Sequence, residues 1–257
     1  MDEINKKVIQ DNIIAHDLLS DSHDSLVSYS RFKKNRKQYF NKMLEISEQD
    51  LSGKEVLELA CGTGIFLEEL SDVGFGKYTG LDLSPKMINI ASSKIDKEKP
   101  IFKKASFICD DFLTSDKLVN ESYDFIFSFS FIHHLYSLDD FESKIYNLLK
   151  KGGVFIGMHE PNPGTRRNLV SKVDSMFYKF SCQIQSFFEL ITNQKKKFNN
   201  LNKKYLESPY IDYQLDHGNF EEYLDKQITS KYSYYDFLGI NNFLPNNYNA
   251  VIIRKEK

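Results

Sequence analysis

Five short apolar runs recur along the first two thirds of the chain, separated by segments of helical length. They cover 55–60, 78–83, 105–109, 123–129 and 153–158, and they are rich in β-branched and aromatic residues. Runs of this kind are typical of buried strands, and their alternation with helices predicts a parallel sheet covered on both faces. We therefore expect an α/β, doubly wound fold.

The flanking segments complete the predicted organisation. Residues 1–50 look helical and are expected to form an N-terminal helical cap, with 51–160 as the sheet-bearing core. Residues 161–228 are expected to form a helical insertion after the fifth strand, and 229–257 to add a pair of strands that completes the sheet. The insertion carries an apolar stripe at the spacing of one long helix: Val170, Val173, Phe177, Phe180, Ile184, Phe187 and Ile191.

The end of the first strand carries the most informative chemistry. Gly62 and Gly64 permit a sharp turn close to a ligand, and Asp82 ends the next strand, where a carboxylate can bind ribose hydroxyls. A dinucleotide fingerprint needs a third small residue, but that place holds Leu67, and no phosphate-binding lysine follows the turn. A carboxylate at Glu58 would repel phosphates and attract a cationic group. The pattern indicates an adenosine-containing ligand without phosphate.

Taken together, the motifs from about 53 to 160 resemble the class I S-adenosylmethionine-dependent methyltransferases. The stretch 58–64 is similar to the family's glycine-rich first motif, with Ala60 where many members have glycine, and 107–112 and 123–135 are similar to its third and fourth strands with their loops. The resemblance implies a seven-stranded, mostly parallel sheet with an antiparallel last strand, here expected from the runs 231–235 and 249–254.

The same resemblance implies S-adenosylmethionine as cofactor and S-adenosylhomocysteine as product. It also assigns the cofactor contacts, in which the glycine-rich turn holds the ligand, Asp82 binds the ribose, and an acid near 110 meets the adenine. The expected cofactor-binding residues are Glu58, Ala60, Cys61, Gly62, Thr63, Gly64, Asp82, Leu83, Met87, Asp110, Asp111, Phe112, Phe129 and Ser130.

A general base is needed when the methyl acceptor is a hydroxyl or an activated carbon. The candidate catalytic residues near the expected methyl side are His133, His134 and His159, with Glu160 beside them, and Tyr29 from the predicted cap. A histidine pair after a strand is also common as pure structure. No H-x-x-x-H or H-E-x-x-H spacing occurs, so we expect no metal.

Composition excludes some classes of protein but does not identify the methyl acceptor. The chain has 257 residues, 41% of them hydrophobic, and a net charge of −2, which gives no general argument for nucleic acid. Its three cysteines indicate neither a disulfide framework nor a cysteine-rich metal site, and with no secretory signal they predict a cytoplasmic protein. The expected place of an Asn/Asp-Pro-Pro-aromatic motif holds 129–132 instead, which argues against methylation of base amino groups in DNA or RNA, but not against methylation at other RNA positions. No DNA partner is expected.

The predicted insertion has three candidate roles. Between 164 and 204 it holds nine lysines and arginines against two acids. It could enclose the substrate as a lid, form a homodimer through a helix at 165–200, or touch an anionic membrane surface to collect a lipid-like substrate.

Two classes of function follow from the sequence. The first is a methyltransferase acting on a small, apolar or aromatic molecule by O-, N- or C-methylation, with RNA or protein as alternative acceptors. The second is a non-catalytic cofactor-binding partner subunit, which the intact Glu58, Gly62, Gly64 and Asp82 disfavour.

Overall fold

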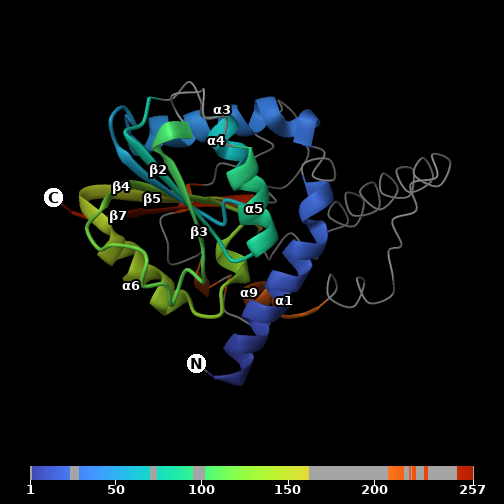
Figure 1. Cartoon of the computed structure of the whole chain (residues 1–257). Coiled ribbons are helices and arrows are strands. Elements are labelled where there is room, and N and C mark those ends of the chain that lie inside the picture. The colour runs from blue at the N-terminus through green and yellow to red at the C-terminus, as the bar shows by residue number, and fades with distance from the viewer. Residues whose placement is uncertain are drawn as a thin grey trace, which may run out of the picture.

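The computed structural model has a central sheet in which the predicted strands lie side by side (Figure 1). It describes residues 2–23, 29–69, 74–94, 102–161, 208–216, 220, 222–223, 229–230 and 248–256. The strands are β1 (Glu55–Leu59), β2 (Lys77–Asp82), β3 (Ala105–Cys109), β4 (Tyr123–Phe129), β5 (Leu149–Pro161), β6 (Thr229–Ser230) and β7 (Tyr248–Arg254).

The order of the strands is β3-β2-β1-β4-β5-β7-β6. The first five are parallel, whereas β7 runs antiparallel to β5, so the mostly parallel sheet with an antiparallel last strand is confirmed. β6 is a two-residue pairing with β7, and the run at 231–235 lies outside the described residues. A sheet with seven strands of the predicted extent therefore stays a prediction.

The order in which the strands are added changes sides at β1: β2 and β3 lie on one side of β1, and β4 and β5 lie on the other. This reversal of the strand order positions the site. The crossovers move outward from β1 to β3 on one side and from β4 to β5 on the other. In open parallel sheets, ligands bind beyond the carboxyl ends of the strands at such a reversal. The ends of β1, β2 and β4 are therefore the expected place for a ligand.

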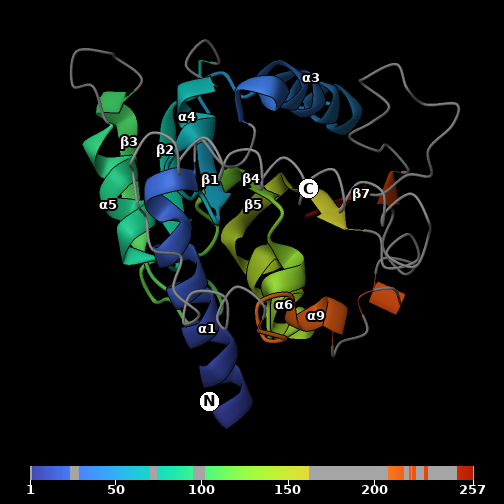
Figure 2. The same ribbon diagram turned by 90° about the vertical axis from the view of Figure 1, so that its right-hand side faces the viewer.

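Alternating side chains of the strands fill two cores, one on each face of the sheet. Val56, Phe125 and Phe127 pack on one face with residues of α3 (Tyr29–Ser47), while Leu57 and Ile126 pack on the other with α6 (Leu138–Leu148). Figure 2 shows α3 and α4 (Ile65–Glu69) on one side of the sheet and α6 on the other. Each strand is thus buried from both sides, which explains why the strands read as nearly continuous apolar runs.

The predicted N-terminal cap consists of two helices with different positions. The second, α3, buries Tyr39, Phe40 and Met43 in the core and so forms part of the layer that covers the sheet. The first, α1 (Glu3–Leu19), packs beside α5 (Pro85–Ser93) and, through the 3₁₀ turn η1 (Ser20–Ser22), leads toward the strand ends (Figure 1).

The connecting helices begin where their sequences provide caps. α5 has Ser84 as N-cap, whose hydroxyl accepts a hydrogen bond from the Met87 N–H at 3.1 Å, and proline follows directly. α6 begins after Ser137, whose hydroxyl accepts a hydrogen bond from the Asp140 N–H at 3.3 Å. The remaining short elements are η2 (Phe102–Lys104), η3 (Ile132–His134) and α9 (Tyr213–Asp216).

Most of the predicted insertion is outside the described residues, including the apolar stripe from 170 to 191 and the helix at 165–200 expected to mediate dimerisation. Its described part folds back onto the core. Gln214 in α9 donates a hydrogen bond to the Leu135 carbonyl at 2.8 Å, and Phe220 is buried in the second core. Across the described ranges, every helix is too short or too polar to cross a membrane.

Candidate functional site

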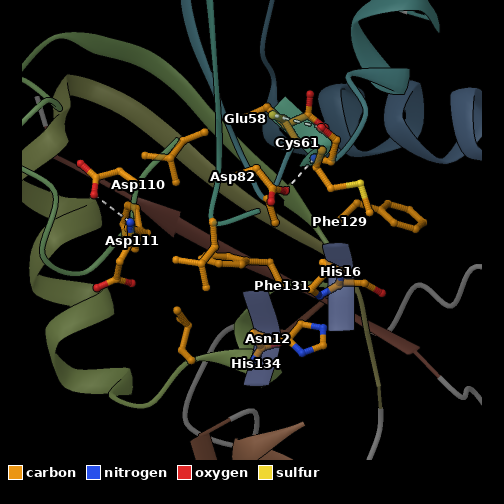
Figure 3. Close-up of a pocket in the computed structure, with 18 of the residues that line it drawn as sticks. Asn12, His16, Glu58, Cys61, Asp82, Asp110, Asp111, Phe129, Phe131 and His134 are labelled. Atoms are coloured by element: carbon orange, nitrogen blue, oxygen red, sulfur yellow. Dashed lines mark hydrogen bonds between the residues drawn. The ribbon is translucent and has the colours of Figure 1, made fainter. Parts of the chain in front are cut away.

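A cavity of about 320 Å³ opens at the carboxyl ends of β1, β2 and β4, where the strand order reverses. Residues from α1 close it on the side opposite the strands (Figure 3). Its lining contains four carboxylates, those of Glu58, Asp82, Asp110 and Asp111, which we call the carboxylate end, and a set of rings, which we call the ring-lined end. The second end includes His16, Phe129, Phe131, His134 and His159.

The turn after β1 and the carboxylate after β2 are directly bonded. Asp82 is buried, and one of its oxygens accepts the Gly62 N–H at 2.8 Å while the other accepts the Ser84 N–H at 2.8 Å. Gly62 has φ +52°, a conformation that favours glycine, and Ala60 shares that region at φ +54°. A carboxylate offers about four lone-pair sites, so Asp82 keeps acceptors for a ligand while its position is fixed by the backbone.

Glu58 is buried at the end of β1, and it is hydrogen-bonded to the hydroxyl of Tyr78 on β2. Burial, followed by the nearby charge of Glu58, raises the pKa of Tyr78 well above its usual value, so the phenol remains a neutral donor. Cys61, next along the turn, is also buried, and burial raises the pKa of its thiol. The turn therefore presents a carboxylate and a neutral thiol.

The loop after β3 holds two further acids in fixed positions. Asp110 accepts hydrogen bonds from Ser115 Oγ at 2.9 Å and from the Asp111 N–H at 3.0 Å. Partial burial opposes its ionisation, but these bonds and Lys117, whose Nζ lies 3.3 Å away, lower its pKa below the usual value. Asp111 accepts from the Tyr136 hydroxyl at 2.9 Å.

Twelve of the predicted cofactor-binding residues line this one cavity, whereas two do not. Thr63 is buried outside the lining. Gly64 has φ +72°, and a Cβ there would lie 3.1 Å from Ala91 Cβ and 3.3 Å from Phe107 Cζ. Gly64 thus allows the turn to pack against α5 and β3. The lining twelve are Glu58, Ala60, Cys61, Gly62, Asp82, Leu83, Met87, Asp110, Asp111, Phe112, Phe129 and Ser130.

A buried carboxylate on β5 organises the loop after β4. Glu160 is fully buried and accepts the N–H groups of Phe131 at 2.9 Å and Ile132 at 3.0 Å. Its other oxygen lies 2.8 Å from His133 Nδ1. His133, a predicted catalytic candidate, is therefore held behind the loop and is absent from the cavity lining. The structure places it in a supporting position.

His134, in contrast, lines the cavity. Its Nδ1 lies 2.7 Å from the Ile211 carbonyl oxygen, which can only accept, so Nδ1 carries the hydrogen and Nε2 of the neutral ring is an acceptor. Burial, and then the neighbouring His133 and His16, lower the pKa of His134 well below its ordinary value. The ring is thus neutral near pH 7 and available as a base.

The third candidate, His159, also lines the cavity, where its ring stacks on Phe129 with centroids 4.6 Å apart. Its Nδ1 lies 2.7 Å from Ser130 Oγ, and the same hydroxyl lies 3.0 Å from the His159 carbonyl oxygen. Both residues have positive φ, +59° for His159 and +56° for Ser130, which is uncommon away from glycine and tends to occur at functional sites. The side chain of Tyr29, the fourth candidate, lies outside the described residues.

Several lining residues were missed from the sequence, chiefly Ile9, Asn12 and His16 on α1. Asn12 is 4% exposed, and the His16 ring meets that of His134 edge-on with centroids 5.7 Å apart. A signal exists, because polar Asn12 falls at helical spacing between the buried Val8 and Ala15. Without knowledge of where α1 packs, however, that pattern is compatible with an ordinary helix face.

One group of possible metal ligands lies beside the cavity. Within the described residues, His133, His134 and Asp212 offer ligand atoms within 4.8 Å of one another. Nδ1 of His134 is already bonded to Ile211 and Nδ1 of His133 to Glu160. The prediction that no metal is bound stays a prediction.

Comparison with known proteins agrees with this architecture. Residues 57–157 match the model of a methyltransferase domain. A demethylmenaquinone methyltransferase from Lactococcus lactis is 33% identical over 102 residues, which cover 38% of this chain and 38% of the relative. A malonyl-[acyl-carrier protein] O-methyltransferase from Bacillus cereus is 29% identical over 136 residues, or 51% of this chain and 47% of the relative.

A solved structure supports the fold of the described residues. An S-adenosyl-L-methionine-dependent methyltransferase from Methanococcus maripaludis superposes with a TM-score of 0.52 at 16% identity, covering 100% of this chain and 96% of that one.

Residues 57–157 thus form a methyltransferase domain, with the fold of the class I S-adenosylmethionine-dependent methyltransferases. S-adenosylmethionine is the cofactor of this class. The chain spans less than half the length of the two curated relatives described above, 38% and 47%.

Proposed function

We propose that this protein transfers the methyl group of S-adenosylmethionine to a small, apolar or aromatic acceptor that carries a nucleophilic hydroxyl, amine or carbon. The observation that carries the proposal is that one cavity joins the carboxylate end beside Gly62 to the ring-lined end with His134 and His159. A donor and an acceptor bound in one cavity would be aligned for direct transfer.

The carboxylate end fits the cofactor by its chemistry. Asp82 would bind the ribose hydroxyls with its remaining lone pairs, and Asp110 would accept from the adenine amino group. The charge of Glu58 would attract the cationic amino-acid portion. When bound, S-adenosylmethionine supplies an electrophilic methyl group on a positively charged sulfur.

The ring-lined end would bind the methyl acceptor and accept its proton. Phe129, Phe131 and Leu135 offer apolar surface that excludes water. For a hydroxyl acceptor, Nε2 of His134 takes the proton as the new bond from oxygen to methyl forms and the bond from sulfur to methyl breaks, its electron pair remaining on sulfur. Glu160 and His133 hold the loop that carries this histidine.

A small acceptor is favoured over a macromolecular one because α1 covers the strand ends and leaves a cavity of limited volume. The relatives named above act on different acceptors, demethylmenaquinone and malonyl-[acyl-carrier protein], so they support the donor and leave the acceptor open. The lid, homodimer and membrane-surface roles of the insertion remain predictions, as does a cytoplasmic location.

Transfer can be tested with a cofactor whose methyl group carries deuterium. Purified protein is incubated with this cofactor and a pool of phenols, aryl amines and quinols, and products are found by mass spectrometry. We expect a labelled product with the wild type and a large loss with His134→Gln, while Asp139→Asn, an exposed change on α6, has no effect. Failure of the wild type both to bind S-adenosylhomocysteine and to form any labelled product would contradict the proposal.

A further inference from the structure

The side chain of Asn12 is fixed in one orientation by three backbone carbonyls. Its Nδ2 donates to the oxygens of Val8 at 2.9 Å, Tyr210 at 3.2 Å and Ile211 at 3.4 Å. Only the amide nitrogen can serve these acceptors, so the two ends of the amide cannot be exchanged. Asn12 therefore ties α1 to the segment that also orients His134 through the Ile211 carbonyl.

The opposite end of the same amide is unsatisfied. Asn12 is 4% exposed and lines the cavity, yet its Oδ1 has no hydrogen-bond partner among the described residues. A buried carbonyl oxygen without a partner is costly, and native proteins rarely keep one without a reason. The missing group must be a hydrogen-bond donor.

Two more acceptors line the same cavity. His134 presents Nε2, because its Nδ1 hydrogen is used by Ile211. His16 follows Asn12 by one helical turn, lines the same cavity and contacts the His134 ring (Figure 3). Burial lowers the pKa of His16, with Asp82 opposing and His23 adding to the effect, so this ring too is held neutral and offers one acceptor nitrogen.

We propose that Asn12, His16 and His134 form a subsite that binds a hydroxyl or amino group of the methyl acceptor and selects ligands that donate hydrogen bonds over ligands of similar shape that do not. The inference rests on the proposed function, because it assigns this end of the cavity to the acceptor. Asn12 is a specificity-determining residue in this account, with Oδ1 as the atom that meets the donor.

The subsite also distinguishes substrate from product. The one hydrogen of an acceptor hydroxyl donates to Asn12 Oδ1 in the bound substrate and moves to His134 Nε2 during transfer, and methylation leaves no hydrogen on that oxygen. The product then leaves the buried oxygen of Asn12 unpaired, and sites built to bond a hydroxyl reject analogues that lack it. Methylation therefore weakens binding and favours release.

A matched pair of probes tests this selectivity without knowledge of the natural acceptor. The affinities of 2-naphthol and 2-methoxynaphthalene are measured by ligand-detected NMR on protein saturated with S-adenosylhomocysteine. We expect the wild type to prefer 2-naphthol by roughly tenfold or more. Asn12→Leu, which keeps the shape and removes the oxygen, is expected to bring the preference close to one. Gln10→Leu, an exposed change on the same helix, should leave it unchanged.

A purely structural role of Asn12 would lower both affinities together and leave their ratio unaltered, and that result would overturn the proposal. A wild type that binds both probes equally, or binds neither, would overturn it too. Should Asn12→Leu fail to fold, wild type labelled with ¹³C-asparagine replaces it, and the Asn12 Cγ resonance must shift with 2-naphthol and stay in place with 2-methoxynaphthalene. Absence of S-adenosylhomocysteine binding to the wild type would instead refute the proposed function itself.

Discussion

The two ends of the cavity are built in different ways. The carboxylate end takes Glu58, Asp82 and Asp110 from the ends of three neighbouring parallel strands, so the topology of the sheet alone brings them together. The ring-lined end takes Asn12 and His134 from two segments that both bond the Ile211 carbonyl, which is 199 positions from Asn12 along the chain. The first end depends on the sheet and the second on how α1 and residues 208–216 pack over it.

The largest expected effect is a loss of affinity for S-adenosylhomocysteine when a residue of the carboxylate end is changed, but not when Asn12 at the other end is changed. Asp82→Asn removes a charge and sets an amide N–H against a backbone N–H, either that of Gly62 or that of Ser84, so we expect binding to weaken about a hundredfold or more. Asn12→Leu should change this affinity little. Calorimetric titration measures both, with the exposed Asp139→Asn as control. Similar losses for the two substitutions would erase the distinction between the ends.

A pair of substitutions tests whether Gly64 is needed because its neighbours pack closely or because its backbone has a positive φ. Gly64→Ala places a Cβ against Ala91 at a positive φ, so unfolding in urea should show a loss of about 3 kcal/mol in stability. Gly53→Ala has a similar φ of +70° with nothing within 4 Å of the added Cβ, and it should cost about 1 kcal/mol. Equal losses for the pair would show that backbone strain, and not packing, explains the glycine.

Glu160 tests whether the loop after β4 depends on one buried carboxylate. Glu160→Gln turns an N–H toward the His133 N–H or its ring, and we expect a loss of about 2 kcal/mol in the free energy of unfolding. Glu45→Gln, in an exposed pair with Lys42, should cost at most about 0.5 kcal/mol. An unfolding curve of Glu160→Gln that overlays the wild type would remove Glu160 from this role.

The effect that is smallest near neutral pH concerns the titration of two histidines. The pKa values of His16 and His134 are lowered in the folded state, so stability falls as pH drops below their ordinary value near 6.5, where the unfolded chain takes up protons first. Below that pH, the doubly substituted His16→Gln, His134→Gln protein should lose stability less steeply, by up to about 1.4 kcal/mol per pH unit for each histidine. Chemical denaturation at several pH values checks the slopes, and parallel slopes would mean that neither ring is held neutral.

The same division explains how far the sequence could predict the structure. The parallel strands and the convergence of Asp82 with Gly62 follow from apolar runs and strand-end residues, because parallel strands present their carboxyl ends together. The position of α1 does not follow, since Asn12 and His16 look like ordinary helix residues until the partner surface is known. Periodicity also assigned β5 to 153–158, whereas pairing with β4 and β7 extends it to Leu149–Pro161.

The central claim is that the carboxylate end binds adenosine without phosphate. Calorimetric titration of the wild type with S-adenosylhomocysteine and, separately, with the phosphate-containing dinucleotide NAD tests it most directly. We predict saturable one-site binding of S-adenosylhomocysteine and no detectable binding of NAD, because Glu58 repels phosphate and Leu67 is buried where a dinucleotide turn needs a small residue. Binding of NAD, or no heat with S-adenosylhomocysteine, would contradict the account.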